Sequence, residues 1–182
     1  MDGPATGRIL GAVLAGGLST RFGSDKAQAL LDGRRLIDHA VDALSAQCDA
    51  VIVVGREEGG LACVPDWPRS HMGPLGGLAG ALAHAARGSY DAVLTCGVDS
   101  PSLPADLLML LAPAPACLHA QPVIGLWPVS AAAVLEAILT GSQNHSVRHF
   151  AERIGARRVE LAIDPVNVNT QADLHQIGQR RR

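Results

Sequence analysis

The sequence predicts an α/β fold of three layers, in which a mainly parallel β-sheet carries helices on both faces. Short apolar runs alternate along the chain with segments of helical periodicity. Parallel strands need such crossover helices, and their right-handed connections place helices on both faces of the sheet. A length of 182 residues suits a single domain with one well-buried core.

The first half of the chain contains four predicted strands and three predicted helices. Apolar runs predict strands at residues 9–16, 49–55, 61–65 and 90–99. Helical patterns predict helices at residues 34–47, 74–88 and 104–111. Leu36, Ala40 and Leu44 share one face of the first helix. Gly88 ends the second, and Pro104 opens the third where a missing N–H costs nothing.

The second half begins with a proline-rich stretch, residues 112–122, which we interpret as a loop within one domain rather than a linker. Strands are then predicted at residues 122–128 and 157–163, and helices at residues 130–139 and 146–154. Thr170 and Asp173 resemble a capping box that opens a final helix. The prediction is one domain over residues 1–182, with loose tails at 1–7 and 179–182.

Composition narrows the function class. A net charge of −2 gives no general attraction to nucleic acid or membranes, and an aromatic content of 3% argues against base stacking on an aromatic platform. No signal peptide or membrane-length apolar run is present. Four widely spaced cysteines without a C-x-x-C pair suggest free thiols in a reducing compartment. We expect a cytoplasmic enzyme with no nucleic-acid or membrane partner.

Polar or glycine-rich clusters follow several predicted strands. A sheet of this kind binds ligands beyond the carboxyl ends of its strands, so these clusters are expected to meet at one rim. The clusters, in chain order, are Gly16 and Gly17 with Arg21 and Lys26, then Asp66 before GPLGG (residues 73–77), then Asp99, and finally Asn167 with Asn169.

The stretch LAGGLSTRFGSDKA, residues 14–27, holds the only lysine among 15 basic residues. Adjacent glycines leave backbone N–H groups accessible to a nucleotide, although a bare glycine pair is more typical of a tight strand-to-helix turn. Arg21 and Lys26 favour a polyphosphate ligand, because charge-assisted hydrogen bonds to phosphate are strong. The loop is neither a P-loop nor the dinucleotide fingerprint G-x-G-x-x-G.

Two carboxylates admit two interpretations each. Asp99 ends an apolar strand, where it either holds Mg²⁺ together with substrate phosphates or caps the following turn. Asp66 either contacts a ligand or shapes a turn. His145 and His149 have the spacing of a metal pair on a helix, but without a third ligand they indicate a solvated face. No nucleophilic triad is apparent from spacing, so a mechanism without a protein nucleophile is expected.

Taken together, these motifs resemble molybdenum cofactor guanylyltransferases, the family that joins GMP to molybdopterin. LAGGLSTRFGSDKA is similar to the family signature L-A-G-G-x-S-x-R-M-G-x-D-K-A, and GPLGGL, VDSPSLP, QPVIGLWP and NVNTQADL follow in the family's order. Gly16 favours guanine over the L-A-A-G of related cytidylyltransferases. The chain departs at Phe22, at Gly55 where relatives often carry a nucleotide-binding asparagine, and at His145.

The resemblance implies a Rossmann-like nucleotidyltransferase fold, with Mg²⁺ as cofactor, GTP as donor and molybdopterin as acceptor. It implies the following roles: Leu14, Ala15, Gly16 and Gly17 bind the nucleotide through backbone, Lys26 binds its phosphates, Asp66 contacts the nucleotide, Asp99 binds Mg²⁺, and Asn167 with Asn169 faces the pterin. Arg21, Lys26 and Asp99 are the expected catalytic residues. Other proteins of cofactor biosynthesis, or acceptor proteins, are possible partners.

Two alternatives stay open on the sequence. The same chemistry with CTP, or with a sugar-phosphate acceptor, would use an equivalent site. A nucleotide-binding module without catalysis is a rival of another class, but Arg21, Lys26, Asp66 and Asp99 are all present.

Overall fold

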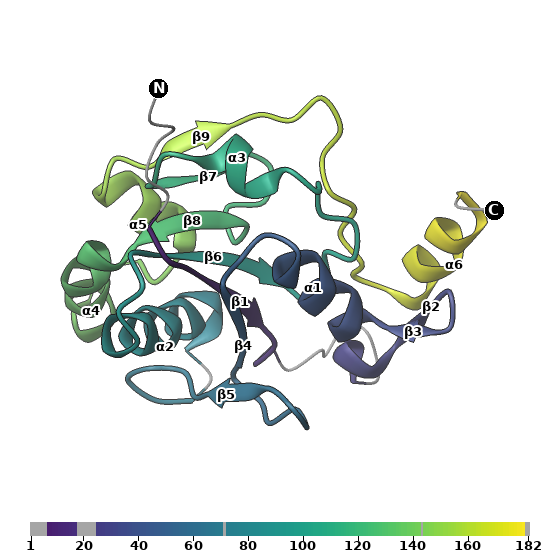
Figure 1. The fold of residues 1–182 in the computed structure, drawn as a ribbon, viewed down its shortest axis with the longest axis horizontal. Helices are drawn as coiled ribbons and strands as arrows, with labels where there is room; N and C mark the ends of the chain where they lie inside the picture. Colours follow the sequence, from purple (N-terminus) through teal and green to yellow (C-terminus); the bar gives the residue numbers. More distant parts are fainter. Residues whose placement is uncertain (1–6, 18–24, 71, 143, 181–182) are drawn as a thin grey trace.

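The computed structural model describes residues 7–17, 25–70, 72–142 and 144–180. A seven-stranded sheet runs through the molecule in the order β5-β4-β1-β6-β8-β7-β9 (Figure 1). Its strands, in chain order, are β1 (Ile9–Leu14), β4 (Ala50–Val54), β5 (Ala62–Val64), β6 (Ala92–Gly97), β7 (Ala116–Leu118), β8 (Gly125–Pro128) and β9 (Arg157–Val159).

The half of the sheet formed by β5, β4, β1 and β6 is entirely parallel. Strand β8 runs antiparallel to both β6 and β7, and β9 pairs in parallel with β7 at the far edge. The parallel half therefore brings the carboxyl ends of four strands to one rim. The predicted fold class, a mainly parallel sheet with helices on both faces, is confirmed.

Helices cover both faces because the residues of the central strand alternate between them. On β1, Leu10 and Ala12 join the core beneath α2 (Gly73–Arg87), α4 (Ala132–Thr140) and α5 (Val147–Arg153). Val13 joins the opposite core, beneath α1 (Leu36–Ser45) and α3 (Leu107–Leu111). All three β1 residues are fully buried. A short 3₁₀ turn, η2 (Val129–Ala131), links β8 to α4.

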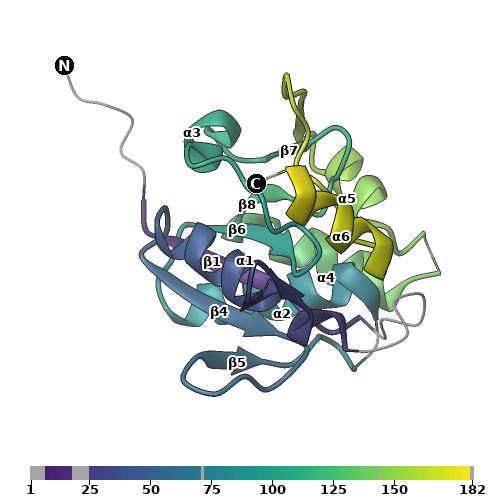
Figure 2. The same cartoon turned by 90° about the vertical axis from the view of Figure 1, so that its right-hand side faces the viewer.

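A third, smaller core lies beside the main sheet. The hairpin β2 (Leu30–Leu31) and β3 (Arg34–Arg35) follows the 3₁₀ turn η1 (Lys26–Gln28), and helix α6 (Gln171–Arg180) packs beside it. Leu31, Leu36, Val168 and Ile177 form this core. Helix α6 lies on the side facing the viewer in Figure 2. The carboxyl-terminal segment is thereby held close to the turn that carries Lys26.

Several element predictions needed correction. The stretch at residues 112–122 is not wholly a loop, since it contains β7. The helix predicted over residues 34–47 begins only at Leu36, because Asp32 and Gly33 adopt positive φ angles and turn the chain into the β2–β3 hairpin. Strand β9 ends at Val159 rather than at residue 163, and α3 begins at Leu107 rather than at Pro104.

Helix α6 begins with the capping box that the sequence predicts. The Asp173 carboxylate accepts hydrogen bonds from the backbone N–H groups of Asn169 and Thr170, both at 2.8 Å. The Asp173 N–H in turn donates to Thr170 Oγ1 at 3.2 Å, which completes the capping box. Helix α6 continues to Arg180, past the predicted start of the carboxyl-terminal tail.

Two of the four cysteines and a tryptophan belong to the core. All four cysteines are free thiols; Cys96 and Cys117 are fully buried, and burial raises the pKa of each. Trp127 is also fully buried, and its indole N–H donates to Thr95 Oγ1 at 2.8 Å. Packing, rather than ligand binding, is therefore the role of Trp127. No helix among the described residues has the length and apolar character to span a membrane.

Candidate functional site

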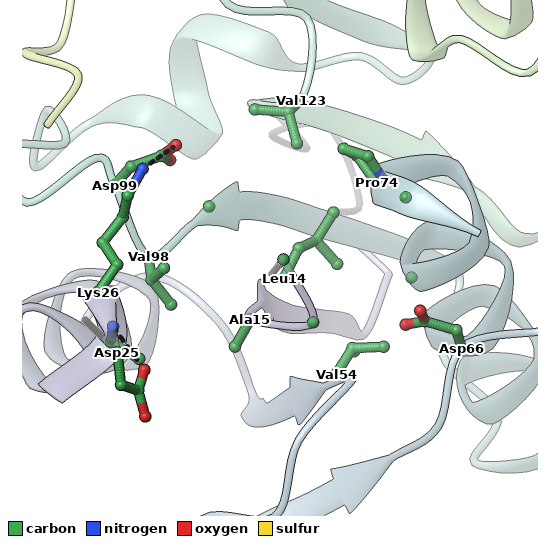
Figure 3. A pocket seen from close by; sticks show the side chains of 16 residues that line it. Leu14, Ala15, Asp25, Lys26, Val54, Asp66, Pro74, Val98, Asp99 and Val123 are labelled. Carbon is green, nitrogen blue, oxygen red and sulfur yellow. Dashed lines mark hydrogen bonds and ion pairs between the residues drawn. The ribbon is translucent and has the colours of Figure 1, made fainter. Parts of the chain in front are cut away.

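A cavity opens at the carboxyl ends of β1, β4 and β6, where the binding site of a parallel sheet is expected. Figure 3 shows Lys26 and Asp99 on one side of it and Asp66 on the opposite side. The cavity is lined by Leu14, Ala15, Gly16, Gly17, Asp25, Lys26, Ala27, Val54, Asp66, Gly73, Pro74, Gly77, Gly97, Val98, Asp99 and Val123. Three of the four clusters predicted at this rim thus meet around one space.

Lys26 and Asp99 form an ion pair within the cavity wall. Lys26 Nζ lies 3.6 Å from Asp99 Oδ2, and their side chains are only 14% and 28% exposed (Figure 3). Lys26 is the first residue of η1, while Asp99 lies two residues beyond the end of β6. The fold therefore places a compact cation beside a hard carboxylate, a combination suited to phosphate groups and a divalent metal.

Gly16 and Gly17 have different functions in the wall. A Cβ atom on Gly16 would lie 3.1 Å from Gly55 Cα and 3.4 Å from Asp66 Oδ1, so Gly16 is needed for close backbone packing. A Cβ atom on Gly17 would meet no described atom within 4 Å. Gly17 therefore keeps a stretch of main chain accessible beside the cavity. The close packing of Gly16 agrees with a tight turn, whereas nucleotide binding along the main chain at Gly17 stays a prediction.

Asp66 is brought to the cavity by the packing of α2 against the end of β5. A Cβ atom on Gly77 would lie 3.6 Å from Asp66 Oδ1, and one on Gly80 would collide with the Pro65 carbonyl oxygen. The Trp67 N–H donates to the Gly76 carbonyl at 3.1 Å, which ties the helix start to the chain after Asp66. Gly80 of this helix thus permits the close approach of the neighbouring backbone.

Asn167 and Asn169 do not line the cavity. Both are exposed, but the residue between them, Val168, is fully buried and donates its N–H to the Asp99 carbonyl at 2.8 Å. The sequence reasoning placed these asparagines at the end of a strand. In fact β9 lies at the far edge of the sheet, and the chain returns from there to Asp99. Asn167 and Asn169 flank the site because the chain after β9 runs back to Asp99.

Sequence reasoning missed the pair formed by Asp25 and Arg56. Arg56 Nη1 and Nη2 lie 2.8 and 2.9 Å from the two oxygens of Asp25, a bidentate geometry. These hydrogen bonds lower the pKa of the Asp25 carboxyl below its ordinary value and raise that of the guanidinium. Arg56 comes directly after Gly55, which ends a predicted strand. Because ligands bind beyond the carboxyl ends of parallel strands, this position could have been recognised from the sequence.

Arg21 lies outside the described residues, as does Phe22. Among the described part of the chain no group of three or more histidine, cysteine or acidic side chains could hold a metal ion by itself. His145 and His149 therefore form no such group within that part. His149 lies in α5, whereas His145 precedes the N-cap residue Ser146, so the prediction that both lie on one helix face is wrong for His145.

A family model described as "MobA-like NTP transferase domain" matches residues 11–161. Curated relatives carry the name molybdenum cofactor guanylyltransferase. The protein of Acidiphilium cryptum is 37% identical over 188 residues, which cover 96% of both chains. That of Rhizobium leguminosarum bv. trifolii is 36% identical over 192 residues, covering 91% of this chain and 90% of the relative.

Solved structures of low sequence identity share the fold. Molybdopterin-guanine dinucleotide biosynthesis protein A from Archaeoglobus fulgidus superposes with a TM-score of 0.71 at 23% identity, covering 94% of this chain and 98% of that one. The 4-diphosphocytidyl-2C-methyl-D-erythritol synthase of Anaerococcus prevotii superposes with a TM-score of 0.69 at 13% identity, covering 97% of each chain. The fold alone therefore does not distinguish guanylyl from cytidylyl transfer.

Proposed function

This chain belongs to the molybdenum cofactor guanylyltransferase family of MobA-like nucleotidyltransferases, and from this we propose that it transfers GMP from GTP to molybdopterin and releases pyrophosphate. It is a nucleotidyltransferase of molybdenum cofactor biosynthesis. One observation carries the finer proposal, the Lys26–Asp99 pair at 3.6 Å on the rim of the parallel strands. The pair supplies the cation and the carboxylate that a metal-bound triphosphate requires.

The proposed nucleotide site follows the walls of the cavity. The main chain of Leu14, Ala15, Gly16 and Gly17 lines one wall. The Ala15 N–H already donates to the Val54 carbonyl at 2.9 Å, so Gly16 and Gly17 are the proposed backbone donors to the nucleotide. Asp66 lies on the wall opposite Lys26, where its acceptor-only carboxylate can receive N–H or O–H donors of the nucleoside. In this arrangement the triphosphate extends toward Lys26 and Asp99.

Mg²⁺ is the proposed cofactor, and the donor set fits it. Mg²⁺ is commonly held by one or two carboxylates with substrate phosphates and water, not by a cage of protein ligands. Asp99 supplies one carboxylate within the cavity wall, and the described residues contain no closed metal cluster. When bound, Mg²⁺ would offset the negative charge of the phosphates. Asp99 is therefore proposed as the residue that holds it.

The proposed reaction is an in-line displacement. An oxygen of the terminal phosphate of molybdopterin forms a bond to the α-phosphorus of GTP, and the bond from that phosphorus to pyrophosphate breaks. The nucleophile comes from the substrate, so the protein contributes positioning and charge stabilisation. Lys26, with Arg21 as the second proposed cation, would stabilise the negative charge that develops on the departing pyrophosphate.

The acceptor is proposed to approach from the side of Asn167 and Asn169. Both side chains are exposed and flank Val168, whose N–H binds the Asp99 carbonyl at 2.8 Å. An acceptor held there would lie beside the carboxylate that holds the metal. Cytoplasmic location, and contact with other proteins of the pathway that supply molybdopterin or receive the product, remain part of this proposal.

Pyrophosphate release, measured with purified protein, Mg²⁺, GTP and molybdopterin, tests the proposal. We expect turnover with GTP that requires molybdopterin, and little turnover when CTP replaces GTP or a sugar phosphate replaces molybdopterin. Preference for CTP, or for a sugar phosphate, would assign the chain to the related reaction. Tight GTP binding without turnover on any acceptor would indicate a module that only binds nucleotide.

A further inference from the structure

Gly55 and Arg56, which directly follow β4, contact the glycine-rich loop (residues 14–27) at Gly16 and at Asp25. Gly55 packs against the start of the loop, since a Cβ atom on it would lie 2.5 Å from Gly16 Cα. Arg56 binds the end of the loop through the bidentate hydrogen bonds to Asp25. Gly16 and Asp25 both line the cavity. The residues that follow β4 therefore contact both Gly16 and Asp25, the residue before Lys26.

Asp25 transmits this contact to the lysine. It is the N-cap residue of η1, and its Oδ1 atom also accepts a hydrogen bond from the Ala27 N–H at 3.1 Å. Lys26 lies between these two residues and is the first residue of the turn. Fixing the Asp25 carboxylate therefore fixes the backbone from which the Lys26 side chain extends toward Asp99.

Arg56 is itself held on its other side. Its Nε atom lies 3.7 Å from Glu58 Oε2, and the Glu58 side chain is only 9% exposed. Glu58 also accepts hydrogen bonds from Arg35 Nη1 at 2.6 Å and from Gln28 Nε2 at 3.4 Å. Gln28 is the last residue of η1, so the β4–β5 connection contacts both ends of the turn. A planar guanidinium can engage both carboxylates in this way, whereas an ammonium group cannot reproduce the fork.

We propose that Arg56 is a positioning residue of the transfer reaction, which acts through Asp25 to hold Lys26 at the phosphate end of the cavity. The inference rests on the proposed function, in which Lys26 binds the phosphates of GTP. Arg56 borders a neighbouring hollow together with Gly16 and Asp66, but it does not line the Lys26–Asp99 cavity. Its effect on turnover is therefore expected to pass through the lysine.

A double-mutant cycle tests this dependence. We expect Arg56→Met to lower kcat/KM for GTP about tenfold in the wild-type background and less than about twofold in a Lys26→Ala background, because a residue that acts through Lys26 has little to act on once the lysine is gone. Arg56→Lys should recover only part of the loss. Equal losses in both backgrounds would show a general structural role and overturn the proposal.

Two further variants separate folding and charge from positioning. Asp25→Asn retains an acceptor for the Ala27 N–H but removes the carboxylate charge that pairs with Arg56, so it should also lower kcat/KM. It tests the same contact in a protein that keeps Arg56, and so replaces Arg56→Met if that variant fails to fold. Arg34→Met removes a guanidinium from an exposed pair with Asp42, at 2.6 Å, and should leave turnover unchanged. A loss in Arg34→Met as large as in Arg56→Met would overturn the proposal.

Because Lys26 is the only lysine, its position can be followed without any activity. In protein grown with ¹³C-labelled lysine, a single side-chain Cε resonance reports on Lys26. We expect this resonance to move in Arg56→Met and Asp25→Asn and to stay in place in Arg34→Met. An unmoved resonance in folded Arg56→Met would overturn the positioning inference. A moved resonance in a protein that turns over no GTP would refute only the proposed function.

Discussion

Lys26 Nζ and Asp99 Oδ2 lie 3.6 Å apart, although Lys26 begins the η1 turn and Asp99 follows β6, the parallel neighbour of β1. Asp99 is anchored independently of the lysine, since its backbone carbonyl accepts the Val168 N–H at 2.8 Å. The lysine is anchored by the η1 turn. The two charges therefore come from separately fixed pieces of backbone, so each can be altered without removing the support of the other.

Replacing Lys26 by alanine is expected to lower turnover at least about a hundredfold, because a donor aimed at charge that develops in the transition state is typically worth a few kcal/mol. The side chain is not part of a core cluster, so the fold should persist. Steady-state kinetics with GTP, together with a thermal melt, measure the two effects. Near-normal turnover would remove Lys26 from the mechanism.

Replacing Asp99 by asparagine is expected to abolish Mg²⁺-dependent activity and to weaken binding of a divalent cation in the presence of GTP. Electron paramagnetic resonance of Mn²⁺, used in place of Mg²⁺, measures this binding directly. Asp106→Asn is the matched control, because Asp106 is an exposed carboxylate outside the cavity. Unchanged Mn²⁺ affinity in a folded Asp99→Asn protein would refute the metal assignment.

The central part of the site could be predicted from the sequence for a simple geometric reason. Parallel strands end at one rim, so residues that follow β1, β5 and β6 must come together once those runs are recognised as strands. Gly16, Asp66 and Asp99 follow these strands directly, and all three line the cavity. Lys26 could be placed at the same rim because it lies only a short way along the chain after the first strand.

The contacts that hold these residues in place were not predictable in the same way. The close approach of Gly55 to Gly16 depends on the separation of two backbones, which no residue pattern encodes. The Arg56–Asp25 pair is one of many possible pairings among the charged residues, and only the fold selects it. Strand β8 was located correctly, but an apolar run does not specify its direction, and β8 proved antiparallel.

Replacing Gly55 by alanine is expected to be more harmful than replacing Gly33. Both glycines have positive φ angles, +86° and +80°, so alanine costs about 1–2 kcal/mol of backbone strain at either position. At Gly33 the new Cβ atom would meet no described atom within 4 Å, whereas at Gly55 it would lie 2.5 Å from Gly16 Cα. Urea unfolding should show the larger loss for Gly55→Ala, and GTP affinity should fall only there. Equal effects of the two substitutions would contradict the packing role of Gly55.

The stabilisation provided by the Asp25–Arg56 pair is expected to depend on pH in the acid range. Hydrogen bonding to Arg56 lowers the folded-state pKa of Asp25 below the ordinary value of 3.8, so the contribution is complete above that value and is lost as the pH falls through the lower folded pKa. Because the Asp25 side chain is 48% exposed, solvent screening limits the contribution to about 1 kcal/mol or less. Urea unfolding of wild type and Asp25→Asn from pH 7 to pH 3 should show a constant difference down to about pH 4 and a shrinking one below it, after correction with Asp106→Asn for the change in net charge. A difference that stayed constant down to pH 3 would mean that the ionised carboxylate is not what stabilises the turn.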